Sequence, residues 1–239
     1  MKVLIMIISD KITNNNLRNI YEKIIIPLKK DNIDTHIATC VNINYDNIIS
    51  KNSKYKFEFD GYQLSKVCYV VNKIDNNDYE YYIKTRPDIF LNTTIDKKFL
   101  LELSKNKINS RCRCYKGPPI DLKFGMSCPP HDIRKGHIQY NDKIIINPDD
   151  QMYIFHKSIK KAFLPITSDT YLNYCKQINN KYEYWIDDWM LNETFWRGSG
   201  EKEGHHKFIW YSRGFDINPI GLDIRLNERE LRSSHLFLK

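Results

Sequence analysis

Near its amino end the chain reads Val3-Leu4-Ile5-Met6-Ile7-Ile8-Ser9. An unbroken apolar run of this length is typical of a strand buried on both faces of a parallel sheet. A helical pattern over Asn14–Lys30 follows, with Pro27 near its end, and Thr35–Val41 supplies a second strand. Strand, helix and strand in this order predict a βαβ unit, and therefore an α/β fold with a parallel sheet.

Similar elements continue along the chain. The composition of each segment predicts further strands at Tyr55–Phe59, Tyr79–Ile83, Ile89–Leu91, Lys143–Ile146 and Phe208–Tyr211. Helices are predicted at Tyr62–Ile74, Asp96–Ser104, Asp149–Ile159, Ser168–Gln177, Tyr184–Trp196 and Asn227–Lys239. Between them, Asn109–Asn141 contains four prolines, three glycines and three cysteines and is predicted to be a long irregular segment.

Length and composition limit the class of protein. The 239 residues, 41% of them hydrophobic, fit one domain over 1–239. No stretch approaches the ~20 apolar residues of a membrane span, and Ser9-Asp10-Lys11 does not resemble a signal-peptide cleavage site, so we expect a cytoplasmic protein. Frequent isoleucine, asparagine and lysine with scarce valine indicate an AT-rich genome, such as that of a giant DNA virus, a protist or a bacterium.

Charge and cysteine content exclude further classes. The net charge of +8 favours the binding of anions in general. The chain has no zinc-finger or RNA-binding signature, so we expect no nucleic-acid partner. Neither GxxxxGK[ST] nor GxSxG is present, which argues against P-loop phosphotransferases and nucleophile-elbow hydrolases. Cys112 and Cys114 are too closely spaced for usual zinc ligands, so with Cys128 they are expected to bind no zinc.

The segment with most chemical content is Lys84-Thr85-Arg86-Pro87-Asp88, at the carboxyl end of a predicted strand. Open α/β sheets bind ligands at this edge. There Lys84 and Arg86 can face phosphate, and the Asp88 carboxylate suits a divalent cation. The alternative is a local ion pair between Arg86 and Asp88. Ser9 and Asp10 end the first strand, where they either contact a ligand or cap the next helix.

The segment Tyr79–Leu91 resembles the "YDYxIRTRPDL" segment of GT-A-type glycosyltransferases, whose acidic end takes the place of the Asp-x-Asp metal motif. Shorter resemblances lie at Gly61–Lys66, Asn147–Met152 and Tyr184–Leu191, so that the likeness spans about residues 1 to 196. It implies a GT-A-like three-layer α/β/α sandwich with a mostly parallel central sheet, and a transferase that uses a nucleotide-sugar donor and a glycan or glycoprotein acceptor. The chain has one acid at this position where the motif has two.

The resemblance also implies roles for individual residues. Donor-side residues are Ser9, Asp10, Arg18, Gln63, Lys66, Lys84, Arg86 and Asp88, of which Asp88 would hold the metal, Mn²⁺ or Mg²⁺. Candidates for the catalytic base are Asp188, Asp187 and Asp150. His205 and His206 are a further metal candidate, and the aromatic residues near Trp185 either stack on a sugar or belong to the core. A binding module of the same fold without turnover stays the alternative.

Overall fold

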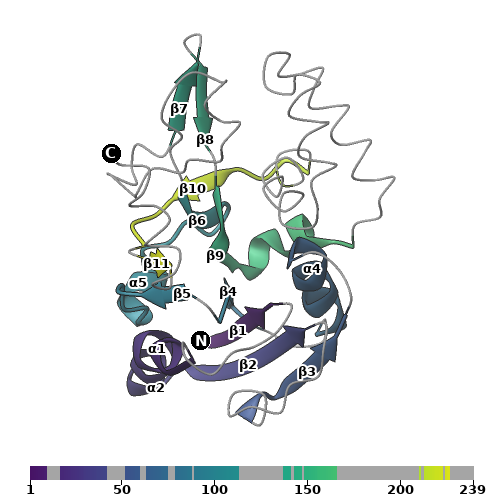
Figure 1. Ribbon diagram of the computed structural model, residues 1–239, viewed down its shortest axis with the longest axis vertical. Coiled ribbons are helices and arrows are strands. Elements are labelled where there is room, and N and C mark those ends of the chain that lie inside the picture. Colours follow the sequence, from purple (N-terminus) through teal and green to yellow (C-terminus); the bar gives the residue numbers. More distant parts are fainter. Residues whose placement is uncertain are drawn as a thin grey trace.

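The computed structural model describes residues 1–9, 17–41, 52–59, 63–74, 79–87, 89–112, 137–140, 143–146, 148–165, 210, 213–222 and 224–226. A seven-stranded sheet organises them (Figure 1). Its strands, in spatial order, are β10 (Ile217–Pro219), β6 (Ile108–Cys112), β9 (Pro148–His156), β4 (Tyr81–Thr85), β1 (Lys2–Ile8), β2 (Asp34–Val41) and β3 (Tyr55–Glu58). Only β9 runs antiparallel to its neighbours in this sheet, which confirms the predicted mostly parallel arrangement.

Strand β1 lies inside the sheet, between β2 and β4, as its sequence predicts. All six residues from Val3 to Ile8 are fully buried. Because side chains alternate along a strand, Val3, Ile5 and Ile7 enter the core on one face of the sheet. Leu4, Met6 and Ile8 enter the core on the other. A strand that is apolar on both faces therefore requires a cover on both.

Helices supply that cover on each face. One core contains residues of α1 (Leu17–Ile20), the π-helix η2 (Tyr21–Ile25), α2 (Ile26–Lys30) and α5 (Lys97–Leu101). The other contains residues of α4 (Gln63–Lys73) and the 3₁₀-helix η5 (Lys157–Phe163). Figure 1 shows α1 and α2 on one side of strands β1, β2 and β3 and α4 on the other. The three-layer α/β/α arrangement is thereby confirmed.

The first helical segment is irregular near Pro27. A proline has no N–H group, so the carbonyl of Lys23, four residues earlier, loses its helical partner. That carbonyl instead accepts a hydrogen bond from Ile95 N at 2.8 Å. The described helix begins at Leu17, and its π-helical part η2 ends at Ile25, two residues before Pro27. A hydrogen bond from a distant part of the chain therefore satisfies the Lys23 carbonyl, which Pro27 leaves without a helical partner.

Most other predicted elements begin and end within three residues of their expected bounds. The matching elements are β2, β3, α4, β4, β5 (Ile89–Leu91), α5 and β8 (Lys143–Ile146). Helix α5 begins after Asp96, whose Oδ1 accepts from Phe99 N at 2.8 Å. The predicted helices 168–177, 184–196 and 227–239 lie outside the described residues, and a single domain over 1–239 stays a prediction.

The prediction of a helix at 149–159 is wrong. Residues Pro148–His156 form β9, which pairs antiparallel with β4 and β6, and only Lys157–Phe163 are helical. The run Gln151–Phe155 is buried throughout and rich in aromatic and β-branched side chains, which suits an interior strand. The acids at 149 and 150 therefore stand at the start of a strand.

The irregular segment predicted at 109–141 is wrong at both ends. Its start belongs to β6, and its end contains β7 (His137–Tyr140), which forms a hairpin with β8.

Two late strands were not predicted: β10, and β11 (Ile224–Leu226), which pairs with β5. Trp210 is helical, contrary to the predicted strand 208–211, whose other residues lie outside the described part. Among the helices that the structure describes, none is long and apolar enough to cross a membrane.

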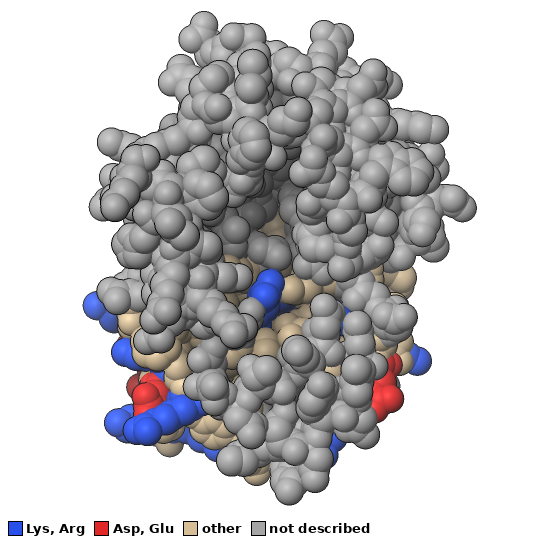
Figure 2. All heavy atoms as spheres, viewed as in Figure 1, with Lys and Arg blue, Asp and Glu red and all other residues tan. Residues whose placement is uncertain are grey.

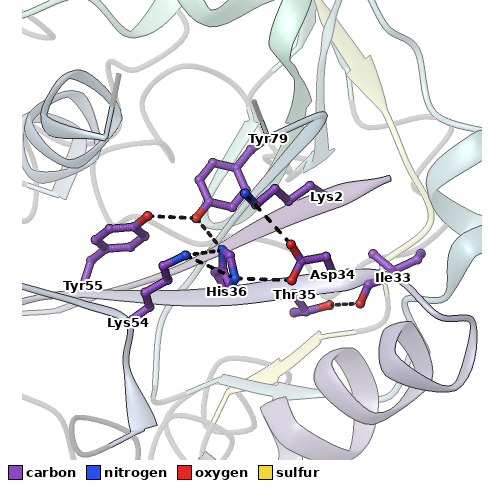
Figure 3. A network of polar contacts seen from close by, with 8 residues as sticks. All are labelled: Lys2, Ile33, Asp34, Thr35, His36, Lys54, Tyr55 and Tyr79. Carbon is purple, nitrogen blue, oxygen red and sulfur yellow. Dashed lines mark hydrogen bonds and ion pairs between the residues drawn. The ribbon is translucent and has the colours of Figure 1, made fainter. Parts of the chain in front are cut away.

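A polar network joins the strands near their amino ends (Figure 3). Its charged or titratable members are Lys2, Asp34, His36, Lys54, Tyr55 and Tyr79. His36 Nε2 lies 3.2 Å from Asp34 Oδ1, and the hydroxyls of Tyr79 and Tyr55 are 3.2 Å apart. Residues from four successive parts of the chain are therefore linked at the edge opposite to the predicted ligand site.

Candidate nucleotide site

The carboxyl ends of β1, β2 and β4 lie side by side. The register pairs Ile7 with Thr85 and Ile8 with Cys40, so these strands end at almost the same level. Ser9 continues past β1, and its N–H donates to Cys40 O at 3.2 Å. In a sheet of this kind the carboxyl edge is the usual place for a ligand. The two predicted segments, Ser9 and the residues from Lys84 onward, thus meet at one edge.

Lys84 joins β4 to the elements on either side of it. Its side chain is fully buried, and its Nζ donates to Gln63 Oε1 at 2.5 Å, from the first residue of α4. It also donates to Gln151 O of β9 at 3.5 Å, and lies 5.5 Å from the centre of the Tyr153 ring. The ammonium group is therefore held on the α4 side of the sheet.

Lys66 makes a second link at the same edge. It lies one helical turn beyond Gln63 and is also fully buried. Its Nζ donates to Ser9 O at 3.1 Å, which joins the first turn of α4 to the end of β1. Ser9, Gln63, Lys66 and Lys84, predicted separately from the sequence, are thus brought together; we call these four residues the lysine cluster.

The lysine cluster places positive charge in the protein interior. Removing an ammonium group from water costs several kcal/mol, which hydrogen bonds such as those to Gln63 and Ser9 offset only in part. Fixed positive charge of this kind attracts anions to the nearby edge. Because Lys66 and Lys84 have no exposed surface, the basic atoms that Figure 2 shows near the centre of one face belong to other residues.

Arg18 lies apart from the lysine cluster. It stands in α1, on the face of the sheet opposite to α4, with an exposed side chain. Its Nε donates to Glu22 Oε1 at 2.6 Å, and this hydrogen bond raises the pKa of the guanidinium further. A nucleotide contact by Arg18 stays a prediction.

The metal predictions fall mainly on residues that the structure does not describe. Asp10 and Asp88 lie outside the described residues, so neither a cation at Asp88 nor its ion pair with Arg86 is tested. Arg86 itself is half-buried directly after β4. Within the described part of the chain, no group of three or more His, Cys, Asp or Glu side chains is arranged to hold a metal ion.

Of the three candidate bases, only Asp150 falls within a described element. It belongs to β9, whose antiparallel register pairs Tyr153 with Lys84, so the start of β9 extends past the carboxyl end of β4. The backbone of Asp150 therefore lies at the edge that carries the lysine cluster, although no helix begins there. Asp187 and Asp188 lie outside the described residues, as do Cys114, Cys128, His205, His206 and Trp185.

Two neighbours of Lys84 were missed by the sequence analysis. The Gln151 carbonyl and the Tyr153 ring contact its ammonium group because β9 pairs with β4. Their segment was predicted as a helix, which separated them from the site. The available signal was the run Tyr153-Ile154-Phe155, in which every residue is β-branched or aromatic.

Comparison with known proteins assigns the chain to no family. No protein-family model matches the chain, and no curated protein matches its sequence. Among similar solved structures is a putative glucose-1-phosphate thymidylyltransferase from Bacillus anthracis in complex with a sucrose: TM-score 0.45, 12% identity, 99% of this chain and 94% of that one. HddC from Yersinia pseudotuberculosis has a TM-score of 0.34 and 13% identity over 68% of this chain and 78% of its own.

A third similar structure is the 4-diphosphocytidyl-2C-methyl-D-erythritol synthase from Anaerococcus prevotii. Its TM-score is 0.44 at 10% identity, over 99% of this chain and 95% of that one. At these levels of similarity no activity is carried over to this chain. The α/β/α class follows from the sheet order and the two cores described above.

Proposed function

We propose that the protein is a glycosyltransferase that uses a nucleotide-sugar donor. The observation that supports this most directly is the lysine cluster at the carboxyl ends of β1 and β4. When a sugar leaves a nucleoside diphosphate, negative charge develops on the diphosphate and has to be stabilised. Buried ammonium groups at the ligand-binding edge are suited to that task.

The donor-side roles follow from position and charge. Lys66 and Lys84 supply positive charge, Gln63 and Ser9 supply hydrogen-bonding groups, and Arg86 follows β4 at the same edge. Asp10 and Arg18 are proposed to contact the nucleotide. A divalent cation, Mn²⁺ or Mg²⁺, held by Asp88 would neutralise further charge on the diphosphate.

On the acceptor side the reaction needs a carboxylate to orient the acceptor hydroxyl or to take its proton. Asp188 is our first candidate, with Asp187 and Asp150 as alternatives. The proposed acceptor is a glycan or a glycoprotein. The pair Asp187-Asp188 lies between Trp185 and Trp189 in the sequence, and aromatic neighbours both raise a carboxyl pKa and offer a surface for a sugar ring.

A thermal-shift screen of nucleotide sugars and nucleoside diphosphates, with and without manganese, tests the proposal. A ligand that binds only the folded protein raises its melting temperature by mass action, by an amount that grows with concentration. We expect a shift with at least one nucleotide sugar, followed by transfer to a glycan acceptor. The absence of any nucleotide-dependent shift would refute the proposal. A shift without transfer to any acceptor would favour a nucleotide- or carbohydrate-binding module.

A further inference from the structure

Strand β3 forms one edge of the seven-stranded sheet (Figure 1). It pairs with β2 on one side, and among the described strands none lies on its other side. The side chains of Lys56 and Glu58 are exposed. Those of Tyr55 and Phe57 are half-buried and pack against the core that contains residues of α4. This edge therefore offers another chain both charged groups and aromatic surface.

The backbone of β3 turns two residues towards the open side. The N–H group of Phe59, directly after β3, donates to Val41 O of β2 at 3.1 Å. Because the backbone groups of successive residues in a ladder point to alternate sides, Phe57 also faces β2. Lys56 and Glu58 consequently direct their N–H and C=O groups away from β2. A strand edge of this kind can pair with the strand of another chain.

The sequence around β3 is complementary in charge to its own reverse. In order, its residues are Lys54-Tyr55-Lys56-Phe57-Glu58-Phe59-Asp60. When two copies pair antiparallel about Phe57, Lys56 lies opposite Glu58 of the second copy. By the same count along the sequence, Lys54 falls opposite Asp60, a residue outside the described part of the chain. Opposite charges directly across two strands stabilise their pairing, and like charges oppose it.

Charge also selects one register. A shift of two residues in one direction brings Lys56 opposite Lys56 of the second copy, and a shift in the other direction brings Glu58 opposite Glu58. Parallel pairing in register sets each charge against its like. The antiparallel register centred on Phe57 makes the charged pairs attractive, and it also matches the outward backbone groups of Lys56 with those of Glu58.

We propose that the protein forms a symmetric dimer in which β3 pairs antiparallel with β3 of a second copy, an interaction that goes beyond the proposed function. Phe57 and its equivalent then form a non-hydrogen-bonded pair, in which side chains approach most closely. The half-buried rings of Tyr55 and Phe57 lose exposed surface there, which favours association. Because the second sheet continues the first with its strands reversed, the two ligand-binding edges lie on opposite sides of the dimer.

Exchange of the two charges tests the dimer. Lys56→Glu carries acids at both positions and Glu58→Lys carries two lysines, so like charges meet when either variant pairs with itself. We expect self-association at least tenfold weaker than that of the wild type in each. An equimolar mixture of the two variants should form a heterodimer, because opposite charges meet again. Both side chains are exposed, so neither change disturbs the core.

Sedimentation velocity measures these states. A strand of four residues gives a small interface, so the wild type should dimerise reversibly between about 1 µM and about 100 µM. Lys98→Glu and Glu102→Lys are the matched controls. Lys98 lies in α5 and Glu102 directly follows it, and both are exposed. Each control should dimerise as the wild type does.

Phe57→Cys tests the register. In the proposed pair the two Cα atoms at position 57 are about 4.5 Å apart, a distance that a disulfide can span. Mild oxidation should therefore link two Phe57→Cys chains covalently through this position, as peptide mass spectrometry can show. The wild type supplies the background from its own cysteines. If Phe57→Cys dimerises without this link, the proposed register is wrong.

Two results would overturn the dimer itself. One is a wild type that stays monomeric up to about 100 µM. The other is the failure of Lys56→Glu and Glu58→Lys to associate when mixed, with both variants folded as judged by their melting temperatures. Neither result bears on the proposed function, which nucleotide binding tests.

Discussion

The imidazole of His36 lies 2.6 Å, from Nδ1 to the oxygen, from the hydroxyl of Tyr79. On the other side of the ring Nε2 faces the Asp34 carboxylate at 3.2 Å, so a neutral ring donates from Nε2 and accepts at Nδ1. Lys54 Nζ lies 3.3 Å from the same Nδ1, as a second donor (Figure 3). The surroundings of His36 therefore match its neutral form.

The stability of the protein should depend on the protonation of His36. Burial lowers the pKa of His36 below its ordinary value of 6.5; Lys54 and Lys2 lower it further, and Asp34 opposes them. The folded protein thus binds the proton less readily than the unfolded chain. His36 contributes stability that is complete above about pH 6.5 and is lost as the pH falls through the lower, folded-state pKa. Urea unfolding across this range should show it.

His36→Asn provides the comparison. Asparagine retains polar groups in place of the imidazole but does not titrate, so the free energy of unfolding of this variant should fall less steeply below pH 6.5. Identical pH dependence in the two proteins would show that another group controls stability here.

Asn19→Ala should destabilise the fold. Asn19 is 5% exposed, and its side chain makes two hydrogen bonds to the Leu91 backbone: Nδ2 donates to the carbonyl at 2.9 Å, and Oδ1 accepts from the amide at 2.7 Å. Alanine leaves both Leu91 groups without these partners. We expect a loss of about 3 kcal/mol in the free energy of unfolding. Arg18→Ala, next to it on the exposed side of α1, should leave that free energy close to the wild-type value.

Cys40 and Cys68 should resist alkylation in the native protein. Both thiols are buried, and burial raises the pKa of each to about 12, so almost no reactive thiolate is present near neutral pH. Peptide mass spectrometry after brief iodoacetamide treatment should find these two residues unmodified, and alkylated once urea is added. Modification of either one in the native state would require a local opening of the α4 side of the core.

Asp88→Asn tests the proposed metal ligand. If Asp88 holds the cation, the variant should fold normally but lose the gain in nucleoside diphosphate affinity that manganese gives to the wild type. Titration with and without manganese measures that gain. An unchanged manganese effect would leave Asp88 as a structural partner of Arg86.

Asp188→Ala tests the proposed base on the acceptor side. Loss of a positioned base slows transfer by about 100- to 10,000-fold, while donor affinity should stay close to that of the wild type. Asp187→Ala is measured in parallel, with initial rates of transfer and donor titration for both. Near-normal transfer in both variants would redirect attention to Asp150, and lost donor binding would place the residue on the nucleotide side.

How well the sequence predicts the site depends on how far apart along the chain the contacting residues lie. The strand ends at Ser9 and Lys84 follow from local apolar runs, and the helical start at Gln63 follows from local periodicity. The contact between Lys84 and Gln63 does not, because 21 residues separate them and their distance depends on how α4 packs on the sheet.

The sequence by itself determined the α/β class, the central position of β1 and the amphipathic α4, because each depends on the spacing of apolar residues within one segment. Only the tertiary structure decided that 148–156 is an antiparallel strand between β4 and β6, and that β10 joins β6 across more than a hundred residues. A short apolar run is equally compatible with a buried helix and with a buried strand. Which one forms is decided by the hydrogen-bonding edges that distant strands present, since buried backbone groups must be paired.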